Sequence, residues 1–481
     1  MDNIINSVLG KIIPSEDEIK LIDNIILKLK TILDASAKKL NVKYTKIEAQ
    51  GSTGIKQTQL KGDYDIDLFI GLDYSLFKPK YEGLSKNKLK KESKKDFLEL
   101  CTSWIIKSLK AEEFKNPRLL YAEHPYVTVD YLINNTKIKI DIVLFFDLDL
   151  DYIKENGPIT AVDRSPWHGR FVRDKLTTPQ KNDVRLLKQF FKAANCYGDK
   201  SAVGKVGFIG YSAELLIYYL GDLYTLFRRF HELETTPLDY YNRSVNELND
   251  IIHFQNDFLI IIDPIDNNRN VASAISKRAY RYCKYLIFQF LKNPNESYFT
   301  LNEIPELDLA TFDESKMKYY FMVELFNCDE NVHYTINRDK LYSLGDSIKA
   351  TGEREYSHEK RFGEIEFELY FNDMRNEYDI AFYVEYPTIS QSYLRQGPPL
   401  TEKYHSQKFK DKNPNFIIKD EYLWVETKRE YNDFLSFLSD YIDINLPENF
   451  KIHNISNMTG VKTNLAKKTL YILKNMVLPF I

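Results

Sequence analysis

The segment GDYDIDLFIGL, residues 62–72, places three aspartates at alternate positions at the start of an apolar run. Successive side chains of a strand point to opposite faces of the sheet, so Asp65 and Asp67 would project from one face. Neighbouring carboxylates repel each other, and burial adds a desolvation cost. This arrangement needs a cation between them, and a hard divalent ion such as Mg²⁺ prefers oxygen ligands. Asp63 follows Gly62 and is assigned to the preceding turn.

A third acid lies in the segment KIKIDIVLFF, residues 137–146, which reads as a strand rich in Ile, Val and Phe. Asp141 is the single acid within it, and an unpaired carboxylate in an apolar strand is costly. We expect Asp141 to join the same cation site from a neighbouring strand. Three carboxylates around two metal ions suit phosphoryl or nucleotidyl transfer. A D-x-D pattern alone is more often a solvated turn, but that reading leaves Asp141 unexplained.

Gly51 and Ser52 stand shortly before the aspartates, after a strand expected over residues 43–49. A glycine ahead of a serine at a strand-to-helix turn exposes backbone N–H groups to an anion such as a triphosphate. The hydroxyl of Ser52 adds another donor. The pair is uninformative alone, but it gains weight from its place just ahead of D-x-D.

Composition narrows the class of protein. The 481 residues are enough for roughly three or four domains, and 43% hydrophobic with 28% charged residues is typical of a soluble chain with real cores. No apolar run approaches the roughly 20 residues that span a bilayer, and no secretory signal is recognised at the start. The four widely spaced cysteines are expected to be free thiols in a reducing cytoplasm. A net charge of only −3 means that a nucleic acid would be held by local patches.

Periodicity gives a coarse organisation. An amphipathic helix is expected over 15–40, strands over 64–71 and 137–146, and a helix over 96–111 that begins in the charged segment before it. Composition shifts near residues 155–169, where glycine and proline break regular structure. Helical periodicity follows over 181–195 and 211–231, then a strand, a turn and a long helix over 258–291. After about residue 300, short strands such as FGEIEFELYF and YDIAFYVEYP alternate with turns and helices.

Together these motifs carry a resemblance. Gly51-Ser52 followed by Asp65-x-Asp67 resembles the signature of the polymerase-beta-like nucleotidyltransferase superfamily. Further segments are similar to the archaeal-type (class I) CCA-adding enzymes, tRNA nucleotidyltransferases that build the 3′ CCA end of tRNA without a nucleic-acid template. These segments are YAEHPYVTVD (121–130), AVDRSPWH (161–168), DVRLLKQFFKAANCYG (183–198), GFIGYSAELLIYYLG (207–221) and DPIDNNRNVASAIS (263–276), with weaker similarity to about residue 435.

The resemblance implies roles for particular residues. The metal ligands of the family fall on Asp65, Asp67 and Asp141, with Mg²⁺ as the expected ion. The expected nucleotide contacts are Ser52, Lys56, Ser165, His168, Lys188, Tyr197 and Arg269, the last of these matching the arginine implicated in recognising the cytosine or adenine base.

The match has departures and rival interpretations. The basic residue that the family commonly has three places after the serine falls on Ile55 here, so we choose Lys56 for that role, and Ser165 replaces a usual threonine. From the residues alone, an inert packed ring is the rival interpretation of His168 beside Trp167. A lone helix lysine such as Lys188 is usually solvated, although the apolar stripe of its helix would leave it at the border.

The expected architecture is mixed α/β and α+β. A polymerase-beta-like nucleotidyltransferase head would span 1–150, a helical neck that binds nucleotide and RNA 151–290, and an α+β body and tail that bind tRNA 291–481. The implied activity is addition of CCA from CTP and ATP to tRNA that lacks it, in the cytoplasm and without a membrane. The basic stretches 78–95 and 461–476 are candidates for RNA contact or solvated surface. The oligomeric state stays open, a homodimer included. The alternatives are another RNA nucleotidyltransferase, such as a poly(A) polymerase or oligoadenylate synthase, and an inactive tRNA-binding protein.

Overall fold

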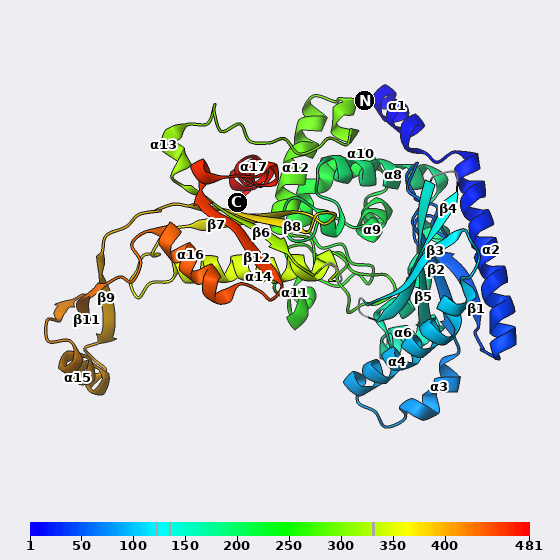
Figure 1. Cartoon of the computed structure of the whole chain (residues 1–481), viewed down its shortest axis with the longest axis horizontal. Helices are drawn as coiled ribbons and strands as arrows, with labels where there is room; N and C mark the ends of the chain where they lie inside the picture. The colour runs from blue at the N-terminus through cyan, green and yellow to red at the C-terminus, as the bar shows by residue number, and fades with distance from the viewer. Residues whose placement is uncertain (122–123, 134–135, 330–331) are drawn as a thin grey trace. The chain divides into compact units, whose positions relative to one another are not determined.

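The structure is a computed structural model that describes residues 1–121, 124–133, 136–329 and 332–481 (Figure 1). It divides into two compact units. Unit 1 comprises Met1–Tyr197, Phe208–Ile275 and Cys283–Leu301, and unit 2 comprises Gly198–Gly207, Ser276–Tyr282 and Asn302–Ile481. The three-part division at residues 150 and 290 stays a prediction. Of the motif at 121–130, Ala122 and Glu123 lie outside the described residues. None of the described helices has the length and apolar character needed to cross a membrane.

A five-stranded sheet in the order β1-β2-β5-β4-β3 forms the head of unit 1. The pair β2–β5 is parallel and the other neighbours are antiparallel. Strand β2 begins one residue after Asp65, so Asp67 lies within the strand and Asp65 just before it, and the shared face of the two side chains stays a prediction. The strands are β1 (Lys46–Gln50), β2 (Ile66–Leu72), β3 (Phe114–Tyr121), β4 (Pro125–Ile133) and β5 (Thr136–Phe146).

The two faces of this sheet differ. Alternate residues of β2, including Leu68 and Ile70, are fully buried in one core cluster with α2 and α4, so these helices cover that face. Helix α2 (Glu16–Leu40) begins at a Ser15 capping box and buries apolar residues at helical spacing, as expected. Helix α4 (Lys86–Leu100) continues through a π turn into α5 (Ile106–Ser108). The opposite face carries Phe69 and, through the same alternation, Asp67.

The rest of unit 1 is mainly helical, as expected for residues 151–290. The helix expected over 211–231 is broken at Gly221 into α9 and α10. The strand expected from the apolar run at 258–262 is wrong: this described stretch makes only isolated bridges, because its partners are single residues such as Leu238 and Asn270. The helices are α1 (Asp2–Ile12), α3 (Tyr74–Tyr81), α6 (Leu150–Asn156), α7 (Ser165–Lys175), α8 (Thr178–Ala193), α9 (Gly210–Leu220), α10 (Leu223–Arg229), α11 (Val245–Asn249) and α12 (Lys277–Lys292), whose first residues belong to unit 2.

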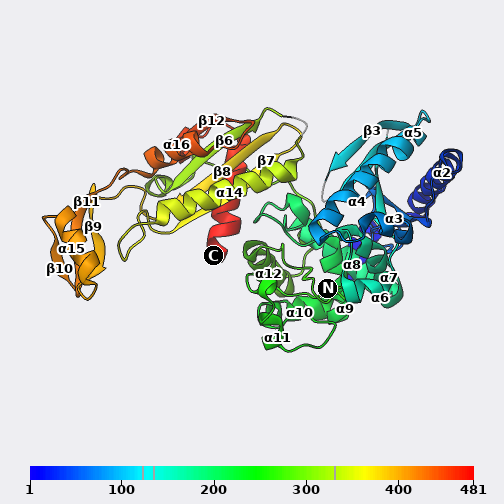
Figure 2. The same cartoon turned by 90° about the horizontal axis from the view of Figure 1, so that it is seen from below.

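Unit 2 is α+β, as expected. Its antiparallel sheet β12-β6-β8-β7 packs α14 and α16 on one face and α17 on the other (Figure 2). A smaller sheet, β10-β11-β9, packs against α15. The elements are β6 (Tyr320–Asn327), β7 (Ile365–Asn372), β8 (Glu377–Val384), β9 (Ser392–Pro399), β10 (Ile417–Lys419), β11 (Tyr422–Lys428), β12 (Phe450–Asn457), α13 (Glu314–Met317), α14 (Tyr334–Glu353), α15 (Lys403–Lys412), α16 (Phe434–Asn445) and α17 (Asn464–Ile472).

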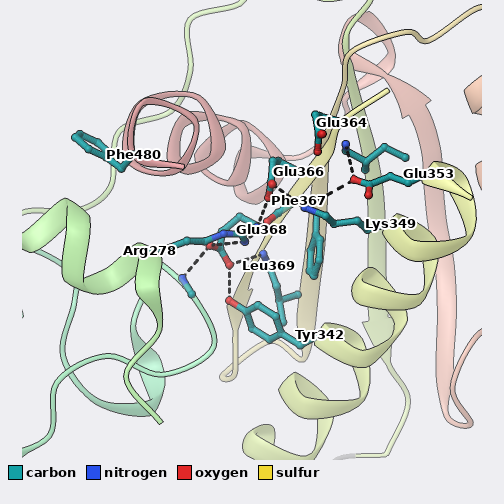
Figure 3. Close-up of polar contacts among 12 residues, drawn as sticks. Arg278, Tyr342, Lys349, Glu353, Glu364, Glu366, Phe367, Glu368, Leu369 and Phe480 are labelled. Atoms are coloured by element: carbon teal, nitrogen blue, oxygen red, sulfur yellow. Dashed lines mark hydrogen bonds and ion pairs between the residues drawn. The ribbon is translucent and has the colours of Figure 1, made fainter. Parts of the chain in front are cut away.

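A buried glutamate of β7 holds the two mid-chain segments of unit 2 in place (Figure 3). The carboxylate of Glu368 accepts hydrogen bonds from the backbone N–H of Gly204 at 2.8 Å and from the Tyr342 hydroxyl, and Arg278 lies 3.4 Å away. Arg278 also pairs with Glu366. A buried carboxylate must be compensated, and these contacts tie residues 198–207 and 276–282 to β7 through Gly204 and Arg278.

Candidate active site

Asp67 and Asp141 lie side by side on the sheet face of unit 1 that α2 does not cover. Strands β2 and β5 run parallel with Asp67 opposite Asp141. The Lys139 ammonium donates to Asp141 Oδ2 at 2.9 Å, whereas Asp141 Oδ1 is buried and, among the described residues, accepts no hydrogen bond. Burial, with repulsion from Asp141 and Asp65, raises the pKa of Asp67 to about 6. One ammonium, that of Lys139, thus faces two carboxylates, so the negative charge of the pair is only partly compensated.

Asp65 lies just before β2, next to this pair. Its backbone oxygen accepts a hydrogen bond from the Thr53 hydroxyl at 2.6 Å. Burial raises the pKa of its carboxyl, and the charges of Asp63 and Asp141 add to the effect. The charge of Asp65 is thus coupled to those of the acid pair.

A divalent cation fits the chemistry of this face. Asp67 and Asp141 offer hard oxygen donors, and the buried Asp141 Oδ1 has no other partner in the described chain. The described residues contain no preformed group of three or more His, Cys, Asp and Glu side chains that could hold a metal. The three-carboxylate site therefore stays a prediction, with Asp67 and Asp141 as its better-placed members.

The Gly51–Ser52 motif lies against the acid pair. Gly51 has a φ of +69°, and a Cβ there would lie 2.4 Å from Asp67 Oδ2, so this position requires glycine. The carbonyl of Ser52 accepts a hydrogen bond from the Thr58 N–H at 3.0 Å, which closes the loop of residues 51–59 (hereafter the Gly51–Gln59 loop). Residues 51–56 are turns rather than the expected start of a helix.

Two predicted nucleotide contacts, Lys56 and Lys188, meet at one buried carboxylate. The Lys56 ammonium lies 2.6 Å from Glu214 Oε2, and the Lys188 ammonium lies 3.4 Å from Glu214 Oε1. Thr58 donates to the same Oε1 and accepts from Lys188. Burial alone would raise the pKa of Glu214, but the two ammonium groups outweigh it and hold the pKa below its ordinary value. Lys188 is 4% exposed, so the expectation that it borders the apolar stripe is wrong.

Two further predicted residues, His168 and Arg269, meet at Asp263. Asp263 Oδ2 lies 2.7 Å from His168 Nε2 and accepts a hydrogen bond from Arg269 Nη1 at 2.8 Å. Its Oδ1 accepts from the hydroxyl of Tyr211 at 3.0 Å. Burial opposes ionisation of Asp263, but His168 and Arg269 outweigh it, so its pKa lies well below the ordinary value. The rings of His168 and Tyr211 stack at 4.3 Å. His168 is therefore packed, as the rival interpretation held, and it is also part of a charged network.

Ser165 and Tyr197 complete the predicted set. Ser165 is the first residue of α7. The Tyr197 hydroxyl and the Lys188 side chain both approach Gly210, the first residue of α9. Burial and the charges of Glu214 and Asp63 raise the pKa of Tyr197. Tyr197 is thus a neutral hydroxyl beside the buried lysine.

A cavity of about 390 Å³, within the size range of small-molecule sites, is lined by some of these residues. The acid pair forms one part of its wall, and the cationic side chains contribute another. Six of the ten predicted residues line it, and in the described chain the lining does not include Ser52, Asp65, Lys188 or Tyr197. The six are Lys56, Asp67, Asp141, Ser165, His168 and Arg269.

The sequence interpretation missed Glu214, Asp263 and Tyr211. Glu214 is the single acid in the apolar helix α9, and Asp263 ends the apolar run before Pro264. Both show the signal that identified Asp141, an isolated carboxylate among apolar residues. Tyr211 offered no such signal, because tyrosine is abundant in this chain.

Comparisons with known proteins show which sequences this chain is similar to. The family model for the second domain of tRNA nucleotidyltransferases matches residues 182–300, which include Lys188, Tyr197 and Arg269. A CCA-adding enzyme of Methanocaldococcus jannaschii is 28% identical over 93% of this chain and 92% of its own length. A CCA-adding enzyme of Saccharolobus islandicus is 31% identical over 87% of this chain and 85% of its own length.

A solved structure of the Cid1 terminal uridylyl transferase is 16% identical, with a TM-score of 0.46, and covers 63% of this chain and 98% of its own. That likeness is too low to assign a fold. The sequence identity to the Saccharolobus islandicus enzyme extends over most of both proteins. This chain belongs to the family of the CCA-adding enzymes.

Proposed function

We propose that this chain adds CCA to the 3′ end of tRNA from CTP and ATP, without a template, and releases pyrophosphate. The observation that carries the proposal is the Asp67–Asp141 pair, in register on one sheet face and lining a cavity that Lys56 and Arg269 also line. Anionic and cationic side chains around one cavity match a nucleoside triphosphate with its metal ions. Family membership supplies the tRNA substrate.

Asp67 and Asp141, with Asp65 beside them, would hold Mg²⁺. When bound, Mg²⁺ lowers the pKa of the attacking hydroxyl and neutralises charge around phosphorus. The terminal ribose hydroxyl of tRNA attacks the α-phosphorus of CTP or ATP, a new phosphodiester bond forms, and the bond to pyrophosphate breaks. The acid pair fixes the position of the reaction. The positive φ of Gly51 lets the backbone of the loop approach Asp67 at this position.

The Glu214 cluster would receive the triphosphate. Two lysine ammonium groups share one carboxylate there, which leaves a net positive charge next to the cavity. In a partly buried place this charge attracts phosphate more strongly than it would in water. Lys56 lines the cavity and is the direct contact, whereas Lys188 is buried behind Thr58 and acts through the loop. Ser52 and Tyr197 add hydroxyl donors near the same loop.

The Asp263 cluster would position the base. Asp263 binds Arg269 through Nη1, which fixes the guanidinium and leaves its other N–H groups for acceptors on cytosine or adenine. His168, held by the same carboxylate and stacked on Tyr211, forms the adjoining wall with Ser165. Base choice would come from this wall together with the RNA end.

The remaining roles extend the proposal to the whole chain. Residues 291–481 and the lysines of 78–95 would contact tRNA, the reaction would take place in the cytoplasm, and the metal would be Mg²⁺. The homodimer stays a prediction.

A stepwise extension assay tests the function. The full chain is given tRNA that lacks CCA, with CTP alone, ATP alone or both. We expect two additions from CTP, a third from ATP, and then a stop. Continued addition from ATP alone would instead indicate a poly(A) polymerase, and no incorporation would indicate an inactive tRNA-binding protein. Asp147→Asn is the matched control for Asp141→Asn, because Asp147 directly follows the same strand and pairs with Lys46.

A further inference from the structure

Unit 1 has a second cavity, of about 470 Å³, bounded by α2, β1, the Gly51–Gln59 loop and α8. Within the described residues it shares no lining residue with the catalytic cavity. The loop nevertheless contributes to both: Gly54 and Ile55 line the second cavity, whereas Gly51 and Lys56 line the catalytic one. The volume lies in the range of small-molecule sites.

One wall of the second cavity carries a buried polar group that lacks a partner. Gln59 lines the cavity and is 4% exposed, and its Oε1 accepts no hydrogen bond among the described residues. A buried acceptor without a donor costs free energy, and such groups are rare in native proteins. A ligand with an N–H or O–H donor would satisfy it.

Another wall carries positive charge in excess of negative charge. Lys181 and Arg185 of α8 both line the cavity. Arg185 donates to the neutral carbonyls of Gln57 and Gln59, so these bonds do not cancel its charge. Burial and repulsion from Arg185 lower the pKa of the Lys181 ammonium.

The acids at the cavity do not offset this charge. Glu48 is already paired with Arg170 at 3.3 Å, and Asp23 is exposed to solvent. The uncompensated charge near Lys181 therefore favours an anionic group.

We propose that this cavity is a second ligand site that binds a mononucleotide. Its phosphate would lie at Lys181, its base would pack against the buried Ile22 and Ile26 of α2, and an N–H group of the base would donate to Gln59 Oε1. A phosphate, a flat apolar ring and an N–H donor occur together in this class of molecule. A single inorganic anion would leave the isoleucines and Gln59 unsatisfied.

The site is mechanically linked to the catalytic loop. Arg185 Nε lies 2.9 Å from the Gln59 carbonyl, and Lys188, one turn later in α8, lies 3.2 Å from the Thr58 carbonyl. A ligand beside Arg185 and Gln59 therefore acts on the loop that carries Lys56. A mononucleotide would then change the affinity for the triphosphate, and the reverse effect must be equal. This coupling rests on the proposed function, whereas the binding itself does not.

Binding is measured by calorimetry, with AMP as the probe and the full chain in EDTA. Without divalent metal, the Asp67–Asp141 pair repels phosphate from the catalytic cavity. Lys181→Ala removes the ammonium group that would bind the phosphate, so it should weaken AMP binding about tenfold. Lys175→Ala, at the exposed end of α7, and Arg269→Ala, in the catalytic cavity, should leave it unchanged.

Gln59→Leu separates binding from folding. It removes the unpartnered acceptor, so the melting temperature should stay equal or rise while AMP binding weakens. The proposal is overturned if AMP shows no saturable binding at millimolar concentration. It is also overturned if binding is insensitive to Lys181→Ala and lost in Arg269→Ala, which would place AMP in the catalytic cavity.

The coupling is tested in the extension assay. AMP should change the KM for CTP in the unmodified chain and leave it unchanged in Lys181→Ala. An inactive chain that still binds AMP through Lys181 would sink the proposed function and keep the second site. An active chain that does not bind AMP would keep the proposed function and overturn the second site.

Discussion

Two groups of carboxylates lie at or near the catalytic cavity, one half-buried and the other fully buried, and they are compensated differently. Asp67 and Asp141 stand side by side, and among the described side chains Lys139 alone is bonded to the pair. Glu214 and Asp263 are each held by three side chains. These are Lys56, Lys188 and Thr58 for Glu214, and His168, Arg269 and Tyr211 for Asp263. The chain thus supplies the counter-charge for one group and leaves the other to a ligand.

This difference separates stability from catalysis. Where the protein neutralises its own carboxylate, removing that carboxylate leaves buried positive charge and destabilises the fold. Where like charges stand together, removing one relieves repulsion and takes away a metal ligand. The following substitutions test this contrast.

The largest effect is expected for Asp141→Asn on catalysis. Nucleotide incorporation should fall roughly a thousandfold or more, because a metal ligand and its transition-state charge stabilisation are lost. Single-turnover extension with CTP measures the loss, and tRNA binding should persist. Near-normal incorporation would remove Asp141 from the metal site.

Glu214→Gln should act on stability first. It leaves Lys188 buried without its carboxylate, which should lower the free energy of unfolding by about 3–5 kcal/mol. Urea unfolding measures the change. Adding Lys188→Met to the same chain should restore part of it, since the uncompensated ammonium is then absent. A Glu214→Gln chain as stable as the unmodified one would contradict the contrast between the two groups of carboxylates.

Arg269→Ala should change selectivity more than stability. The ratio of CTP to ATP incorporation should shift about tenfold or more, because a hydrogen-bond donor to the base is lost. Asp263 keeps its contacts with His168 and Tyr211, so the fold should persist. Arg243→Ala is the control, as Arg243 pairs with Asp239 and does not line the cavity in the described chain. An unchanged ratio would argue against base recognition by Arg269.

Thr58→Val should give the smallest effect. The hydroxyl of Thr58 donates to Glu214 and accepts from Lys188, so its loss should cost about 1–2 kcal/mol of stability. Thermal unfolding detects it. A cost as large as that of Glu214→Gln would show that the hydroxyl, and not the charge, carries the cluster.

The sequence predicted the acid pair better than the compensated clusters. Asp141 is recognisable because it is the single acid in an apolar strand, although the sequence interpretation did not use its partner Lys139, two residues earlier. Glu214 carries the same signal in α9, but its partner Lys56 is 158 residues away, and no local pattern shows which cation reaches it.

Irregular structure limited what the sequence could predict about the remaining residues. The run before Asp263 has the composition of a strand, yet its neighbours are single bridging residues. Helical periodicity predicts a border position for Lys188. It does not reveal the carboxylate, distant in the sequence, that a buried lysine needs. Lys56, chosen over Ile55, does line the catalytic cavity, while Ile55 lines the second one.

Thermal unfolding of the unmodified chain, Asp141→Asn and Glu214→Gln, in EDTA and then in Mg²⁺, tests the contrast most directly. We predict that in EDTA Asp141→Asn melts at or above the unmodified chain and Glu214→Gln well below it. Mg²⁺ should raise the melting temperature of the unmodified chain and leave that of Asp141→Asn unchanged. A metal-free Asp141→Asn that melts as low as Glu214→Gln, with no Mg²⁺ effect on the unmodified chain, would contradict the assignment of the acid pair to a metal.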